Sequence, residues 1–214
     1  MNIQFKKKAC LLAVASALTF GSAMTAQADI VVLEGVNNQG TTNVLLTDAD
    51  NAAVVNGTVG PAGPVVNFTS TGGTLDADAS GQARISAGSN NDPYDQLSFE
   101  LASGDMFTRA VFNIDAATDG MVSFLVDGVN ITGGSFSREV DANGENFFTI
   151  TAINNQFISS ISLTGIDGAT FADVQQVRIG GVVAAIPEPE TYALMMAGLG
   201  AIGFMARRRK QKQS

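Results

Sequence analysis

The sequence contains no histidine and no tryptophan, and its single cysteine, Cys10, stands close to the amino terminus. A lone cysteine cannot form an internal disulfide, whatever the redox conditions of the compartment. The absence of histidine excludes zinc, copper and iron sites that depend on His and Cys ligands. It also excludes the Ser-His-Asp and Cys-His arrangements of nucleophilic enzymes. Any chemistry must therefore use carboxylate, amide and hydroxyl groups.

The amino-terminal segment has the features of an export signal. Lys6-Lys7-Lys8 precede an apolar run over 9–23, and Ala26-Gln27-Ala28 gives the small-x-small pattern that signal peptidase accepts. We interpret residues 1–28 as a Sec-type signal peptide with a helical apolar run, cleaved after Ala28 at a site formed by Ala26 and Ala28. Cys10 lies at the start of the apolar run, so it is not a lipidation site and would leave with the signal.

The carboxy-terminal segment contains three features in a fixed order. Pro187-Glu188-Pro189 comes first, an apolar run over 192–206 follows, and Arg207-Arg208-Arg209 ends it. Proline fixes φ and lacks an N–H, so the first part is expected to be extended and unable to join a sheet. The run of about 15 residues is shorter than the roughly 20 that span a bilayer, and it predicts a hydrophobic helix. The arginines favour a cytoplasmic end, which leaves the preceding chain outside.

This order of features resembles the PEP-CTERM sorting tail of Gram-negative bacteria. Pro187, Glu188, Pro189 and Glu190 match its processing motif, and Arg207, Arg208 and Arg209 match its membrane stop. The resemblance covers about the last 25 residues and implies cutting near Pro-Glu-Pro by an exosortase, a membrane-embedded cysteine enzyme that releases or re-attaches the passenger. Ile186 departs from the usual valine. The alternative is an ordinary membrane anchor, which requires no Pro-Glu-Pro and is usually longer.

The predicted passenger, residues 29–185, is strongly acidic. Most of the 12 Lys and Arg residues lie in the terminal segments, whereas 18 of the 20 acidic residues lie between them. The passenger keeps four basic residues, all arginines, and a net charge of −14 (Arg84, Arg109, Arg138 and Arg178). This charge argues against a nucleic-acid partner, whose phosphates need a basic face. It permits cations and favours solubility.

Short alternating or β-branched runs recur through the passenger between clusters of Gly, Asn, Asp and Pro. Their spacing of about 8 to 15 residues predicts an all-β, antiparallel β-sandwich of jelly-roll-like type, with an immunoglobulin-like sandwich as the alternative. Over 171–176 we expect at most one short turn of helix, and around Asn143-Gly144 a hairpin loop. The predicted strands cover 30–36, 53–59, 64–69, 82–86, 96–101, 109–114, 121–126, 136–140, 147–153, 159–164 and 175–182.

Acidic turns are the candidate binding sites. Asp48, Asp50 and Asn51 place oxygen ligands at alternating positions and could bind Ca²⁺ with a backbone carbonyl, although the spacing is not that of an EF-hand. Asp76-Ala77-Asp78 and the pair Asp92/Asp95 are similar clusters. All of them are also typical of solvated turns, because Asp and Asn bond their own backbone there. Apart from calcium we expect no cofactor.

Two further functions are compatible with the composition. A glycoside hydrolase needs two carboxylates about 5 to 10 Å apart, but acids in solvated turns lack the raised pKa that one of them requires. A carbohydrate-binding module would need a contact surface, and the loop with Asn90, Asn91, Asp92 and Tyr94 is the best candidate, since tryptophan is absent. The phenylalanines lie mostly within predicted strands and are expected in the core.

The sequence thus predicts an exported, non-catalytic surface or extracellular-matrix protein processed by exosortase. Its expected partners are signal peptidase, exosortase and, transiently, the inner membrane, with the cell surface or matrix as destination. The resemblance also implies an association with exopolysaccharide and biofilm. A Ca²⁺-dependent or carbohydrate-binding module and a carboxylate-based hydrolase remain the alternatives.

Overall fold

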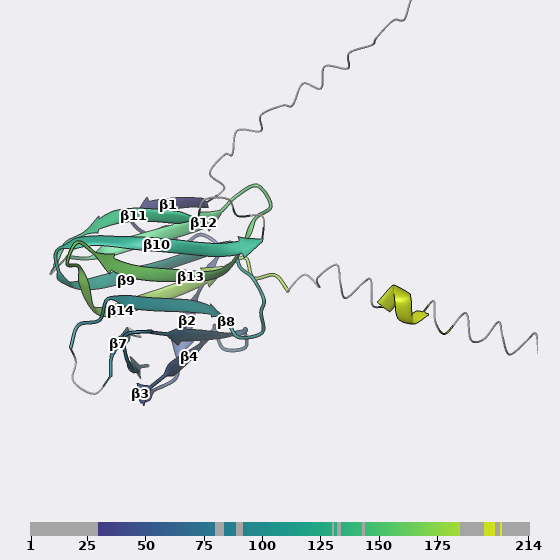
Figure 1. The fold of residues 1–214 in the computed structure, drawn as a ribbon, viewed down its shortest axis with the longest axis horizontal. Helices are drawn as coiled ribbons and strands as arrows, with labels where there is room; N and C mark the ends of the chain where they lie inside the picture. Colours follow the sequence, from purple (N-terminus) through teal and green to yellow (C-terminus); the bar gives the residue numbers. More distant parts are fainter. Residues whose placement is uncertain are drawn as a thin grey trace, which may run out of the picture.

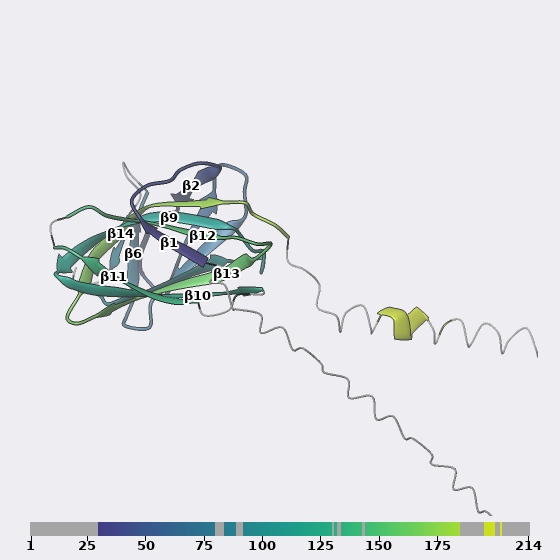
Figure 2. The same ribbon diagram turned by 90° about the horizontal axis from the view of Figure 1, so that it is seen from above.

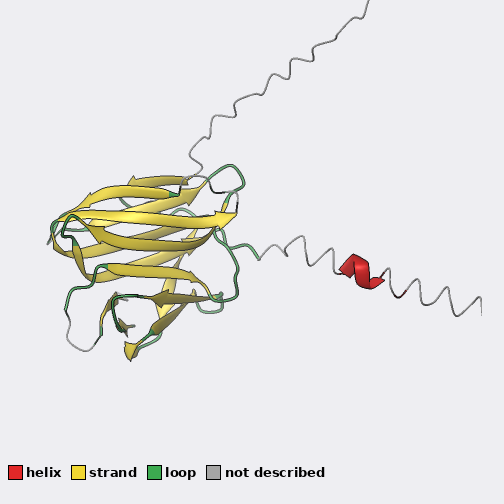
Figure 3. Ribbon diagram, in the orientation of Figure 1, coloured by secondary structure: helices red, strands yellow, loops and turns green. Residues whose placement is uncertain are grey.

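A computed structural model describes residues 30–79, 84–88, 92–129, 131, 134–142, 144–184, 195–199 and 202. The described residues between 30 and 184 form two stacked antiparallel β-sheets, which Figure 2 shows as separate layers. One layer includes β1 (Ile30–Glu34), β9 (Arg109–Thr118) and β12 (Asn146–Ala152), and the other includes β10 (Gly120–Val129) and β13 (Phe157–Ile166). Figure 3 shows that almost all of this body is strand, joined by short loops. The predicted all-β, antiparallel β-sandwich is therefore confirmed.

The first sheet follows the order β1-β12-β9-β14-β7-β6-β3, and every pairing in it is antiparallel (Figure 1). Its strands are β1 (Ile30–Glu34), β12 (Asn146–Ala152), β9 (Arg109–Thr118), β14 (Thr170–Gly180), β7 (Arg84–Ala87), β6 (Leu75–Asp78) and β3 (Ala49–Ala52).

The second sheet follows the order β4-β5-β8-β13-β10-β11, again antiparallel throughout. Its strands are β4 (Val54–Val59), β5 (Val65–Thr69), β8 (Gln96–Leu101), β13 (Phe157–Ile166), β10 (Gly120–Val129) and β11 (Ser135–Val140). In β10 the predicted alternation holds, because Val122, Phe124 and Val126 are buried and the residues between them are not.

Strand β2 (Thr41–Leu46) belongs to both sheets and closes one side of the sandwich. Its first half pairs with the end of β14, through Thr42 and Ile179, and its second half pairs with β4, through Leu45 and Thr58. A Cβ placed on Gly57 of β4 would lie 2.6 Å from the Val44 side chain, so glycine is what lets β2 approach at this corner.

A bulge in β14 makes room for β2. The register with β9 shifts between Gln175 and Arg178, and Gln176 has a φ of 54°. On the other edge of β14, the residues before the bulge pair with β7 and the residues after it pair with β2. One edge of a single strand therefore has two neighbours, one in each half.

Phenylalanine side chains fill the space between the sheets. Phe124 of the second sheet packs at 4.9 Å from Phe148 and 6.1 Å from Phe112, both of the first sheet, between ring centroids. Phe99 contacts Phe112 at 5.8 Å and Phe68 at 5.7 Å. These five rings are 1% exposed or less, as expected for core residues, so burial of aromatic surface drives the two sheets together.

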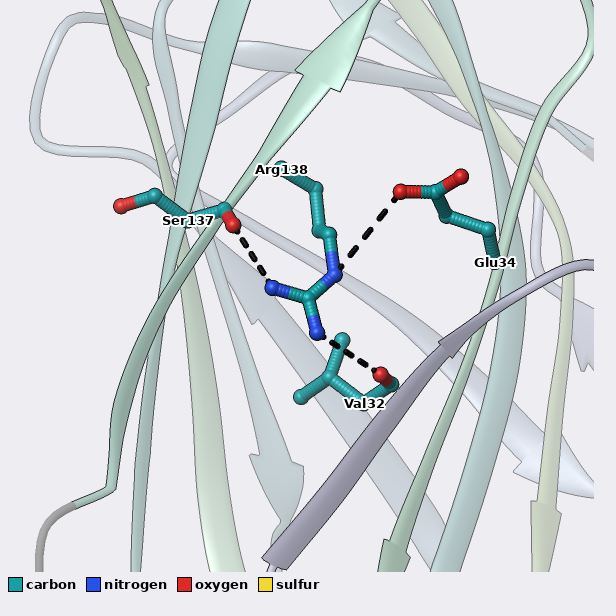
Figure 4. A network of polar contacts seen from close by, with 4 residues as sticks. All are labelled: Val32, Glu34, Ser137 and Arg138. Carbon is teal, nitrogen blue, oxygen red and sulfur yellow. Dashed lines mark hydrogen bonds and ion pairs between the residues drawn. The ribbon is translucent and has the colours of Figure 1, made fainter.

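Arg138 connects the two sheets on the open side of the sandwich, where β1 and β11 are the edge strands. Its guanidinium donates to the carbonyl oxygens of Val32 at 3.0 Å and Ser137 at 2.8 Å, and its Nε lies 3.8 Å from a carboxylate oxygen of Glu34 (Figure 4). Val32 and Glu34 belong to β1 and Arg138 to β11, so one side chain connects the two sheets.

Some sequence predictions are wrong, for identifiable reasons. No strand was predicted over β2, β3 or β6, because their polar residues interrupt the apolar alternation on which the prediction depended. Residues 171–176 belong to β14 rather than to a helical turn, because they pair with both β9 and β7. The expected hairpin between 140 and 147 is a connection between the sheets, since β11 pairs with β10 and β12 with β1 and β9. Alternation over 109–114 would leave Val111 and Asn113 exposed, but both are buried in β9.

The predicted signal helix lies outside the described residues. In the carboxy-terminal segment, residues 195–199 and 202 are helical. Among the residues that the structure describes, no helix is both long and apolar enough to cross a membrane.

Tyr94 gives a test of how the first sheet is held together. Its buried hydroxyl donates to the carbonyl oxygen of Ile85 in β7 at 2.9 Å and also hydrogen-bonds to the Val174 backbone in β14. We expect Tyr94→Phe to lower the free energy of unfolding by about 1–3 kcal/mol, measured by urea denaturation, because buried backbone groups lose a partner.

Ser123→Ala is the matched control for this change. It also removes one hydroxyl, but from a partly exposed position on β10, and its effect should stay within about 0.5 kcal/mol. Equal effects of the two substitutions would show that the Tyr94 hydroxyl contributes nothing to stability.

Candidate functional site

The sheet formed by β14, β7, β6 and β3 carries an open, acidic cavity of about 630 Å³ on its outer face. We call it the Asp173 pocket, and its polar lining consists mainly of five aspartates and one arginine: Asp48, Asp50, Asp76, Asp78, Asp173 and Arg84. Two acidic clusters that are separate in the sequence therefore meet in one cavity, together with two residues that the sequence analysis did not select.

Strand register explains why these residues meet. The inner row crosses three strands: Val174 of β14 pairs with Ile85 of β7, and Ile85 pairs with Ala77 of β6. All three residues lie in the core. Neighbouring positions in a strand point to opposite faces, so the residues on either side of this row point outward. One outer row runs from Asp173 to Ser86 to Asp76, and the other from Gln175 to Arg84 to Asp78.

The predicted calcium ligands take part in hydrogen bonds that connect the segment around β3 to the segment around β6. A carboxylate oxygen of Asp48 accepts a hydrogen bond from the Ala79 backbone at 2.7 Å, and the Asn51 backbone donates to Asp76 at 2.6 Å. Asn51 has a φ of 51°, a left-handed conformation that Asn tolerates better than most residues. Among the described residues, no three His, Cys, Asp or Glu side chains are grouped so that they could hold a metal ion. Calcium binding at Asp48, Asp50 and Asn51 stays a prediction.

Asp173 has an unusual environment for a carboxylate. The residue is only 4% exposed, and its Oδ1 atom is buried without a hydrogen-bond partner. Its Oδ2 atom lies 3.4 Å from the Arg84 guanidinium, which is itself half-exposed. Burial raises the pKa of the Asp173 carboxyl, the charge of Arg84 lowers it, and the charge of Asp115 on β9 raises it, with a net rise. A buried acceptor without a donor is costly, and this cost contributes to the raised pKa of the carboxyl.

In the loop that the sequence suggested for sugar binding, Tyr94 lines a cavity together with Asp92, but most of its side chain is buried. Tyr94 is 8% exposed, its hydroxyl is bonded to Ile85, and its ring packs edge-on against Phe171 at 5.8 Å. Burial raises the pKa of the Tyr94 phenol far above its usual range, with a further rise from the Asp173 charge, while the Val174 hydrogen bond lowers it. Asp92 lines a separate cavity of about 430 Å³, and Asn90 and Asn91 lie outside the described residues.

The residues predicted for processing all lie outside the described part of the chain. These are the signal cleavage residues Ala26 and Ala28, the motif Pro187, Glu188, Pro189 and Glu190, and the basic stop Arg207, Arg208 and Arg209. Their roles therefore rest on sequence alone.

Arg84 and Asp173 were the residues that sequence reasoning did not find. One signal was available, because Arg84 is one of only four basic residues in a passenger with 18 acidic ones. A cation at such a low frequency is expected to be paired. Its partner could not be named, since Asp173 lies 89 positions further along the chain and only the pairing of β14 with β7 brings the two together.

Comparison with known proteins supports the interpretation of the tail. A family model of the PEP-CTERM protein-sorting motif matches residues 185–210, a range that includes both the Pro-Glu-Pro motif and Arg207–Arg209. The chain therefore carries a PEP-CTERM sorting motif, as the sequence analysis predicted. No curated protein matches the chain.

Solved structures with weak similarity are carbohydrate-binding modules. A family 29 module is 16% identical, with a TM-score of 0.34, over 67% of this chain and 88% of that one. A family 35 module, CBM35 from Cellvibrio japonicus Abf62, is 13% identical, with a TM-score of 0.30, over 73% of this chain and 98% of that one. Similarity at this level carries no information about a ligand of this chain.

The raised pKa of Asp173 predicts a pH dependence of stability. Because the folded state holds this proton more tightly than the unfolded state, the free energy of unfolding should fall as the pH rises from the ordinary value of 3.8 through the raised pKa. Asp173→Asn should remove this contribution, which thermal unfolding at a series of pH values between about 4 and 7 would measure.

The control is Asp127→Asn, which removes one carboxylate from β10 in the opposite sheet. It should keep the pH dependence of the unmodified chain. If the stability of Asp173→Asn and that of the unmodified chain depend on pH in the same way, Asp173 does not take up a proton in the folded state over this pH range.

Proposed function

We propose that this chain is an exported surface or extracellular-matrix protein of a Gram-negative bacterium, processed by an exosortase and non-catalytic in its β-sandwich. The observation that carries the proposal is the sorting motif at 185–210, which follows directly on a sandwich with its own hydrophobic core. Signal peptidase and exosortase are its processing partners, and the inner membrane holds it in transit. Association with exopolysaccharide, and hence with biofilm, is the role outside the cell.

The composition and the site both favour a non-catalytic sandwich. The described strands contain no His or Cys, so a nucleophile with a histidine base is excluded there. A carboxylate hydrolase remains the weakest candidate. It would need a protonated acid in contact with the substrate, and Asp173, with its raised pKa, has a side chain only 6% exposed and paired with Arg84.

A binding function is the second candidate, and the Asp173 pocket is the observation that favours it. Its volume of about 630 Å³ lies within the roughly 300–1,000 Å³ of small-molecule sites. The lining is mostly carboxylate, which suits ligands with hydroxyl, ammonium or metal groups. A carbohydrate-binding or Ca²⁺-dependent module would therefore use this face of the first sheet.

The fate of the tail tests the sorting proposal. In wild-type cells, mass spectrometry of the exported protein should find a mature carboxy terminus without Arg207–Arg209. In cells that lack the exosortase, the same protein should keep its tail and stay in the membrane fraction, because the uncut apolar segment holds it there. Replacing both Pro187 and Pro189 with alanine should reproduce this retention in wild-type cells.

Pro61→Ala provides the matched control, since Pro61 lies in the turn between β4 and β5 and outside the motif. That variant should be processed normally. A mature wild-type protein that still contains Arg207–Arg209 would overturn the sorting proposal and establish a permanent membrane anchor in its place.

A further inference from the structure

We propose that one end of the β-sandwich rests on the lipid surface of the membrane while the sorting tail is uncut. The inference rests on the proposed function, because it takes the tail as the segment that holds the exported chain in the membrane. The end in question, which we call the tail end, is formed by five connections and the segment after β14. The connections lead into β2, β5, β9, β11 and β13, and the described residues are 38–40, 60–64, 102–108, 131, 134, 153–156 and 181–184.

Strand pairing brings these segments to the same end of the body. The end of β14 pairs with the start of β2 and with the start of β9, whose other neighbour is the end of β12. In the second sheet, the start of β5 pairs with the end of β8, and the end of β10 pairs with the start of β13. Phe107, just before β9, exchanges backbone hydrogen bonds with Ile158 of β13, so the ends of the two sheets lie together. In Figure 1, β10 points toward the end of the body from which the chain continues after β14.

The tail end carries little charge, although the passenger is strongly acidic. Among its described residues, Asp105 is the one charged residue. The nearest acids of the described strands are Glu100 and Asp127, whose side chains point sideways from the outer face of the second sheet. The connections at the opposite end lead into β8, β10, β12 and β14 and contain six acidic residues (Asp92, Asp95, Asp119, Asp141, Glu145 and Asp167).

This distribution of charge decides which end can approach a bilayer. A membrane with anionic lipids has a negative surface potential, which acts on charged groups within roughly 8–10 Å at physiological ionic strength. The acidic residues of the opposite end would be repelled there. The tail end, with Asp105 as its one described charge, meets little repulsion.

Exposed apolar side chains occur at the tail end. Val65, the first residue of β5, is 41% exposed, and Val129, the last residue of β10, is 38% exposed. Val182, in the segment after β14, is 36% exposed. Pro61 and Ala62, between β4 and β5, are exposed as well. Apolar side chains gain free energy when they leave water, so these residues favour contact with the interfacial region of a bilayer.

A short tether keeps this end close to the membrane. Val183 and Met106 exchange both backbone hydrogen bonds, at 2.8 and 2.9 Å, so the chain is fastened to the body as far as Val183. The apolar run begins at Tyr192, and the chain between Val183 and Tyr192 can span at most about 32 Å. Strand β14, with 11 residues, is itself roughly 33 Å long. To turn the opposite end toward the membrane, the tether would have to run fully extended along the whole body.

A tethered body needs only a weak contact. A partner held by a short flexible linker has an effective concentration in about the millimolar range, so a few exposed apolar side chains suffice to keep the tail end on the surface. This advantage is lost once the tail is cut, so the mature protein should leave the same surface. The exosortase is the alternative partner for this end, and the experiment below separates the two.

Vesicles test the inference with the tail-bearing protein, purified from cells that lack the exosortase. They contain phosphatidylethanolamine, phosphatidylglycerol and a lipid with a spin label on its headgroup, which quenches a nearby fluorophore. Cys10 belongs to the predicted signal peptide, so a single introduced cysteine can be labelled in the exported chain. Ala62→Cys places the fluorophore at an exposed position of the tail end, and Thr71→Cys places it at an exposed position beyond the other end of β5. The label at position 62 should be quenched several-fold more strongly than the label at position 71.

Two valine variants locate the contact. Val65→Glu adds a carboxylate at the tail end and should reduce quenching of the label at position 62 toward the level found at position 71. The added charge is repelled by anionic lipids and resists transfer out of water. Val54→Glu is the matched control, because Val54 is also 41% exposed but lies at the opposite end of the paired strands β4 and β5. It should leave the quenching unchanged.

Several outcomes would overturn the inference. Equal quenching at the two positions would show that neither end is preferred, and quenching at neither would show that the body stands away from the lipids. Quenching at position 62 that appears only when purified exosortase is added would make the enzyme the partner. A tail-bearing protein that does not float with the vesicles would also refute the membrane-held intermediate of the sorting proposal. If the protein floats and its tail is processed in cells, loss of the quenching difference refutes this inference alone.

Discussion

The bulge in β14 is the constraint on which the rest of the sandwich depends. A regular strand would offer one continuous edge to one neighbour, but the shift at Gln176 divides that edge into two. The part after the bulge receives β2, which then crosses to the second sheet and joins the layers. The part before it receives β7, which brings β6 and β3 and all the carboxylates they carry. Closure of the fold and assembly of the acidic pocket therefore share one local irregularity.

The described strands contain no cysteine, so no disulfide joins them. Three other features hold the two sheets together: a shared strand on one side, an arginine between edge strands on the other, and aromatic rings between the layers. The aromatic rings are 1% exposed or less, so they stabilise the body by burying apolar surface. The arginine contributes in a different way, since its bond to the Val32 carbonyl engages a backbone group on the exposed edge of β1, the kind of group to which another chain's strand could otherwise add.

Sequence periodicity predicted the strands whose apolar residues alternate, and it did so because one face of each is buried in the core. It failed for β2, β3 and β6, where Thr41–Asn43, Asp50-Asn51, and Asp76 and Asp78 are polar and leave few apolar positions to alternate. Composition also indicated that acids were the available ligands. It could not indicate that the acids near positions 48 and 76 would meet Asp173, because that depends on strand order, which alternation does not encode.

The two ends of the sandwich differ in what they carry. Ile30 pairs with Ala152, the Ala152 N–H donates to the Thr108 carbonyl, and the Thr108 N–H donates to the Gly180 carbonyl. The start of β1 and the end of β14 therefore lie at the same end of the sandwich. Asp173 lies seven positions earlier in β14, roughly 20 Å away at about 3.3 Å per residue. An attachment through either terminus therefore lies at the end of the sandwich where Ile30 and Gly180 are found. The carboxylates of the Asp173 pocket lie toward the opposite end.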